Sequence, residues 1–161
     1  MLRVSRSASF VAGALIGLST LATTTASADD GGGESPLLRS SVGASMPDDH
    51  DLFMVQPGSL PWVIEEGDVR LDGDGSLRVE VEGLIVPTLH KNPVPMLAAS
   101  VACNGAVVAT TKAVPFSMAG DARIRAHVML PMRCLAPAVL LNPAKSDGTV
   151  NAGFFIGASG R

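Results

Sequence analysis

The sequence predicts an all-β domain, an antiparallel sandwich of about seven short strands with one disulfide bond. Three observations predict it. Apolar and polar residues alternate with the period of two that half-buried strands show, turn-forming residues recur every ~8–12 positions, and the chain has two cysteines. No stretch after residue 28 shows the 3.6-residue period of an amphipathic helix.

The clearest strand is expected over 77–85, where Leu77 and Val79 share one face and Arg78 and Glu80 share the other. This alternation indicates one face in the core and one in water. The same reasoning predicts further strands over 60–64 continued by 69–71, and over 96–103, 106–113, 123–130, 138–141 and 150–158.

Two tight turns are predicted between neighbouring strands. Asp72–Gly75 and the pair Asn104-Gly105 both contain glycine, which adopts the positive φ that a short hairpin requires. The strand count and turn spacing favour an immunoglobulin-like arrangement. One feature departs from it: Trp62 precedes both cysteines, whereas the core tryptophan of antibody-type domains lies between them.

Residues 1–28 are predicted to be a secretory signal peptide. Arg3 and Arg6 supply the positive start, the apolar run 10–22 follows, and Ala26–Ala28 fits the A-x-A cleavage pattern. The run of about a dozen apolar residues is shorter than the ~20 that a membrane-spanning helix needs. We therefore expect cleavage after Ala28, no membrane span in the cleaved chain, and a secreted, extracellular product.

Composition divides the rest of the chain in two. Residues 29–56 are acidic and glycine-rich, with too little apolar surface to offset the entropy of ordering, and are predicted to form a flexible tether. Within them, Leu52–Val55 is expected to be either a short strand or an arm that docks on the domain. Residues 57–161 are predicted to be the β-sandwich domain.

The charge balance limits the partners. Without the signal peptide the chain keeps ten of its twelve basic residues and all fifteen acidic ones, a formal charge of −5. Nucleic-acid-binding domains and polybasic membrane-surface segments both need a net excess of positive charge. The composition therefore excludes a basic nucleic-acid footprint and a polybasic membrane patch.

The two cysteines, Cys103 and Cys134, are predicted to form a disulfide bond. An exported chain with an even cysteine count favours a bond over two free thiols. In the chain-entropy model, a closed loop of about 30 residues stabilises the fold by roughly 3.5 kcal/mol. Because Cys103 is in phase with Leu97, Ala99 and Val101, its side chain should face the core.

The stretch from 60 to 158 resembles small exported β-sandwich proteins of uncharacterised function from high-GC, actinobacteria-like bacteria. The segments that carry the resemblance are Ala102–Gly105, Gly120–Ile124 and Cys134–Ala138. The resemblance implies a common fold and supplies no activity.

No catalytic site is predicted, and we expect a protein that is not an enzyme and uses no cofactor. Gly157–Gly160 is similar to a nucleophile elbow, but it lacks the G-x-S-x-G spacing. Aligning Asp72 and Asp74 with an EF-hand loop puts Arg70 and Val81 where oxygen ligands are required, so that interpretation fails. Weak calcium binding at this turn stays open beside a solvated hairpin.

A copper site is the alternative function that we keep. His127 and Met129 are two residues apart, so on a strand both side chains face the same way, and Met132 lies close behind. Imidazole and thioether ligands suit Cu(I). Arg123 and Arg125 are expected on the same face and would repel a cation.

The long loop Val86–Pro95 is the candidate binding site, through Pro87, His90, Lys91 and Asn92, because loops on rigid β scaffolds often carry recognition. A proline-stiffened connector is the alternative. The leading hypothesis is therefore a secreted, non-enzymatic binding module that contacts an unidentified protein or another cell-envelope component. Its oligomeric state stays open.

Overall fold

The computed structural model describes residues 36–160, which form an all-β domain. The predicted signal peptide and residues 29–35 lie outside the described residues. The strands are β1 (Leu38–Ala44), β2 (Gln56–Pro57), β3 (Glu66–Leu71), β4 (Ser76–Glu82), β5 (Met96–Cys103), β6 (Ala106–Thr110), β7 (Val114–Pro115), β8 (Ala122–His127), β9 (Ala138–Ala144), β10 (Phe154–Phe155) and β11 (Gly157–Ser159). A 3₁₀ turn, η1 (Pro87–Leu89), follows β4, and no helix in this part of the chain has the length and apolar character of a membrane span.

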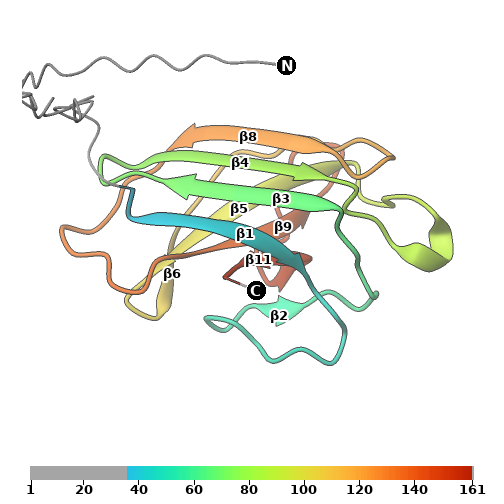
Figure 1. The fold of residues 1–161 in the computed structure, drawn as a ribbon, viewed down its shortest axis with the longest axis horizontal. Helices are drawn as coiled ribbons and strands as arrows, with labels where there is room; N and C mark the ends of the chain where they lie inside the picture. Colours follow the sequence, from blue (N-terminus) through green and yellow to red (C-terminus); the bar gives the residue numbers. More distant parts are fainter. Residues whose placement is uncertain (1–35, 161) are drawn as a thin grey trace, which may run out of the picture. The chain divides into compact units, whose positions relative to one another are not determined.

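Nine strands form one antiparallel sheet in the order β6-β5-β9-β11-β1-β3-β4-β8, with β7 paired to β5. The sheet curls into a half-barrel, so β3, β4 and β8 lie across from β5 and β9 (Figure 1). The predicted all-β, antiparallel class is confirmed. The structure has eleven strands where about seven were expected: β1 was not predicted, β2 and β7 have only two residues, too few to show an alternation, and the strand expected over 150–158 is divided into β10 and β11.

Strand β1 joins the two halves of the sheet. Residues 38–41 pair with β3, and residues 42–44 pair with β11. The predicted tether over 29–56 is therefore wrong for this strand. Its sequence shows little alternation, but a strand that pairs along two neighbours satisfies its backbone whatever its side chains are. The side chain of Val42, 5% exposed, adds to the core.

The inner faces of the two halves enclose a single core. In β4, Leu77, Val79 and Val81 are buried while Arg78 and Glu80 are exposed, as the alternation predicted. They pack with side chains from the opposite half of the sheet, among them Leu97, Ala99, Val101, Cys103, Val139 and Leu141. Burial of each large aliphatic side chain is worth about 1.5–3 kcal/mol, so this core supplies much of the stability.

A second apolar cluster covers the outer face of β9 and β11. It consists of Val55, Leu140, Phe155 and Ala158. Leu52–Val55 reaches it through a tight turn, in which the backbones of Leu52 and Val55 exchange hydrogen bonds of 2.9 Å. Of the two expectations for this segment, the docked arm is closer to the structure, and residues 45–56 belong to the domain.

Strands β4, β6 and β8 end three residues before their predicted ends and β9 ends three residues after its predicted end, and two predicted strands differ more. Leu60–Ile64 is not a strand: Trp62 is buried in the core and Val63 forms only an isolated bridge with Ile85. The single strand expected over 150–158 is divided into β10 and β11. Both predicted hairpins are confirmed, and Asn104 and Gly105 both have positive φ, 56° and 83°, as a type I′ turn requires.

The predicted disulfide between Cys103 and Cys134 is present, with the two Cα atoms 4.9 Å apart. Asn104 holds the same segment independently. Its side-chain Nδ2 donates to the carbonyl of Arg133 at 2.8 Å, and its Oδ1 accepts from the backbone N–H of Leu135 at 2.9 Å. The end of β5 is therefore fastened to residues 133–135 by one covalent bond and by hydrogen bonds.

The first prediction concerns the disulfide. Replacing Cys103 and Cys134 together by serine should lower the free energy of unfolding by about 3 kcal/mol, because the unfolded chain regains the loop entropy. Chemical denaturation measures the change, and wild-type protein unfolded under reducing conditions should show the same loss. Equal stability of the oxidised and reduced wild type would contradict it.

The second prediction tests the position of β1 against β3. A Cβ on Gly67 would lie 2.7 Å from Val42 Cβ and 2.7 Å from Ile64 Cδ1. Gly67→Ala should therefore destabilise the domain by about 1–3 kcal/mol through overpacking. Gly153→Ala is the matched control, since its Cβ would meet no atom closer than 3.7 Å. Thermal unfolding that gives equal midpoints for both variants would mean that β1 does not pack here.

Candidate binding face

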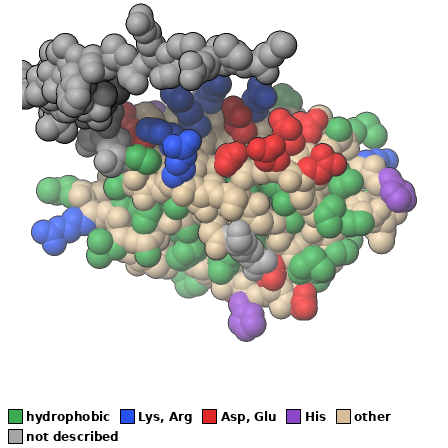
Figure 2. Space-filling model, in the orientation of Figure 1, with side chains coloured by type: hydrophobic (Ala, Val, Ile, Leu, Met, Phe, Trp, Pro, Cys, Tyr) green, Lys and Arg blue, Asp and Glu red, His purple; other side chains and the backbone are tan. Residues whose placement is uncertain are grey.

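The outer face of β1, β3, β4 and β8 is strongly charged. Side chains that do not enter the core point outward from these four strands, and five of the six arginines between residues 36 and 160 are among them. The three lysines of the same range lie outside these strands. Positive and negative side chains occupy adjacent zones of the visible surface (Figure 2).

Four arginines stand side by side across the four strands. The register pairs Arg39 with Arg70, Arg70 with Arg78, and Arg78 with Arg125. We call Arg39, Arg70, Arg78 and Arg125 the arginine row. With neighbouring strands ~4.8 Å apart, its four Cα atoms span roughly 14 Å. Like charges directly opposite each other on a sheet are destabilising, so this arrangement works against the stability of the domain.

Carboxylates neutralise the arginine row only in part. Asp72 binds Arg70, with an Nη2–Oδ1 distance of 2.9 Å, and this hydrogen bond with its charge raises the pKa of Arg70. Glu80 Oε1 lies 4.0 Å from Arg125 Nη2, a distance at the limit of an ion pair. Arg39 and Arg78 form no ion pair with any described residue. Both side chains are exposed.

An acidic band lies next to the arginine row on the same face. Its members, Glu66, Asp68, Glu80 and Glu82, face one another in register across β3 and β4. The band is exposed. It places negative charge along one side of the arginine row.

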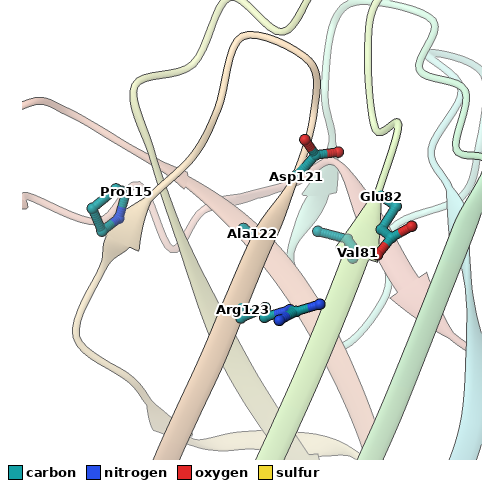
Figure 3. Close-up of a pocket in the computed structure, with 6 residues that line it drawn as sticks. All are labelled: Val81, Glu82, Pro115, Asp121, Ala122 and Arg123. Carbon is teal, nitrogen blue, oxygen red and sulfur yellow. The ribbon is translucent and has the colours of Figure 1, made fainter.

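A shallow groove opens where the acidic band meets β8. It holds about 530 Å³ and is lined by Val81, Glu82, Pro115, Asp121, Ala122 and Arg123. Figure 3 shows Asp121 and Glu82 at one end of this groove, Arg123 at the other, and Pro115 across from them on β7. Arg123 also lies 3.8 Å from Glu80, so its charge is shared with the acidic band.

The predicted copper residues lie at the other end of β8. His127 and Met129 line one groove of about 460 Å³, which brings them together as expected. Met132 does not line it, and its side chain is fully exposed. Lys112 and Arg125 line the same groove, so a cation there would meet two positive charges. Copper binding stays a prediction.

The carboxylates of the turn considered for calcium are engaged within the protein. Asp72 pairs with Arg70. Asp74 accepts the backbone N–H of Ser76 at 2.8 Å and hydrogen-bonds its hydroxyl at 2.9 Å. These bonds, the backbone one first, lower the pKa of Asp74. The turn therefore uses both carboxylates to fix the β3–β4 hairpin.

The candidate loop is ordered by Asn92. Its Nδ2 donates to the carbonyls of Val94 at 2.7 Å and Ser117 at 2.9 Å, and its Oδ1 accepts the N–H of Val94 at 2.7 Å. Asn92 is buried and so holds the loop, whereas His90 and Lys91 are exposed. Pro87 begins the 3₁₀ turn η1 and fixes the backbone there, which supports the interpretation of this loop as a proline-stiffened connector.

The third prediction follows from these bonds. Asn92→Ala should lower the free energy of unfolding by about 1–2 kcal/mol, because the partly buried carbonyls of Val94 and Ser117 and the N–H of Val94 lose their partner. Lys91→Ala is the control and should leave stability within about 0.5 kcal/mol. Urea denaturation of both variants measures the difference. An Asn92→Ala variant as stable as wild type would show that the loop is ordered by other contacts.

The arginine row could not be predicted from the sequence. The sequence places Arg78 and Arg125 on the outward faces of their own strands, but only the strand register aligns them with each other, with Arg70 and with Arg39 of the unpredicted strand β1. Comparisons with protein-family models, with curated proteins and with solved structures found no match to this chain. The binding face is therefore identified from the geometry of the domain itself.

Proposed function

We propose that this protein is an exported, non-enzymatic binding module that contacts a component of the cell envelope or the exterior through the outer face of β1, β3, β4 and β8. One observation carries the proposal: this face is exposed and carries unneutralised charge. The opposite half of the sheet has its outer face covered by the second apolar cluster. The outer face of β9 and β11 is therefore covered by apolar side chains, whereas the outer face of β1, β3, β4 and β8 is open to solvent.

The polar groups support binding more than catalysis. His50 lies in the irregular segment between β1 and β2, His90 follows η1 with a φ of 52°, and His127 ends β8, so the three histidines occupy separate parts of the domain. Ser159, the serine of the elbow-like segment, accepts the backbone N–H of Val139 through its Oγ at 2.8 Å. That hydroxyl joins two strands.

Export is part of the proposal. The predicted signal peptide supports it, and a disulfide between Cys103 and Cys134 is the kind of bond that forms and persists in oxidising compartments. The resemblance to small exported proteins of high-GC bacteria points the same way.

The immunoglobulin-like sandwich is also kept as a proposal. Its support is that two opposed inner faces share one core and that β1 pairs with one half at its start and with the other at its end. Trp62 packs into that core, although it precedes both cysteines.

The fourth prediction tests the binding face. Purified protein should co-sediment at low salt with a cell-envelope fraction of the producing organism. Arg78→Gln combined with Arg125→Gln should reduce the sedimented fraction at least tenfold, because the change removes two charges from the face. The matched control is Arg133→Gln combined with Lys145→Gln, which removes the same charge from elsewhere and should sediment like wild type.

Two results would overturn the proposal. Wild-type protein that stays in the supernatant at low salt would show no envelope partner. Equal loss of sedimentation in both double variants would show that net charge, and not this face, is responsible. Thermal unfolding of each variant checks that the domain is intact.

A further inference from the structure

We propose that the arginine row is a binding site for a linear ligand that carries consecutive phosphate groups and lies across the strands from β1 to β8. This inference rests on the proposed function and names the ligand class for the same face. Three features of the row carry it: its composition, its incomplete neutralisation and its direction.

Composition points to an oxyanion. All five basic residues of the face are arginines, and the lysines of residues 36–160 lie elsewhere. A guanidinium presents a rigid fork of donors that binds oxyanions in a bidentate way, whereas an ammonium group acts as a point charge. A surface that needed positive charge only for solubility would not require arginine at each of these positions.

The incomplete neutralisation shows where the ligand sits. Arg70 is engaged by Asp72, and Arg125 is 4.0 Å from Glu80, while Arg39 and Arg78 have no carboxylate partner among the described residues. Arg78 stands between Arg70 and Arg125, so it faces like charge on both sides. An anion over Arg78 relieves this repulsion in both directions, which makes Arg78 the centre of the site.

The direction of the row favours phosphate over carboxylate. Adjacent members are one strand spacing apart, so a terminal phosphate, with three acceptor oxygens, can bridge two neighbouring guanidinium groups, and an internal phosphate can give each of them one of its two non-bridging oxygens. A carboxylate has two oxygens, and one bidentate fork uses both. Several phosphates in sequence can follow the row, and the acidic band repels them on one side of it.

The fifth prediction uses tripolyphosphate as the probe, with the purified protein and isothermal titration calorimetry at low salt. Wild type should bind it, and orthophosphate and a short polyglutamate should bind at least tenfold more weakly. Arg78→Gln should weaken tripolyphosphate binding at least tenfold, and Arg78→Lys should fall between it and wild type because it keeps the charge and loses the fork. Arg133→Gln, an exposed arginine away from the face, is the matched control and should bind like wild type.

The melting temperature separates a binding role from a structural one. Without ligand, Arg78→Gln should melt at the same temperature as wild type or higher, because it removes repulsion. Tripolyphosphate should raise the melting temperature of wild type and leave that of Arg78→Gln almost unchanged. A lower melting temperature of the ligand-free variant would mean that Arg78 supports the fold.

Several outcomes would overturn the phosphate site. The first is that Arg133→Gln weakens tripolyphosphate binding as much as Arg78→Gln does. The second is that orthophosphate binds as tightly as tripolyphosphate. The third is that the protein self-associates and that both Arg78→Gln and Glu66→Gln abolish the self-association. The last would assign the face to a second copy of the chain, with arginine row against acidic band. Envelope binding through this face without tripolyphosphate binding would refute the ligand class and leave the binding module intact. Loss of both would refute the two proposals together.

Discussion

The pairing of β1 with two different neighbours is the interaction on which the rest of the structure depends. Residues 38–41 extend the β3-β4-β8 half, and residues 42–44 extend the β11-β9-β5 half. Without this strand each half of the sheet would have a free edge. The two halves would then be connected only by loops and by the side chains that pack in the core between them. The close approach of Gly67 to Val42 shows how tightly β1 is fitted.

Much of the fold could be predicted from the sequence because its signals are local. The alternation in β4, the Asn104-Gly105 turn and the pairing of two cysteines each follow from a few neighbouring residues. Strand β1 could not be predicted in the same way. Its order comes from backbone hydrogen bonds to residues that are distant in the sequence, and two serines and a glycine within seven residues give no clear pattern. The single curled sheet, which depends on β1, was missed with it.

The candidate face was missed for a related reason. Net charge and residue spacing do not show which distant residues become neighbours in the fold, and the chain as a whole is acidic. Arg39, Arg70 and Arg78 come close to one another only through register, so a local row of positive charge is hidden within a negative total. Of the candidate residues chosen from the sequence, His127 and Met129 line one groove. Asn92, by contrast, is buried and forms hydrogen bonds that hold the loop.

The arginine row is complete only when β1 pairs with β3 in the observed register, which sets Arg39 opposite Arg70. Side chains alternate along a strand, so a slip of one residue would turn Arg39 toward the core side and Ser40 outward. The row is composed of residues from four strands between positions 39 and 125 and has no counterpart in an unfolded or partly folded chain. Only a domain in which β1, β3, β4 and β8 have assembled in this register presents the row. An unfolded chain would have the same arginines but not the surface.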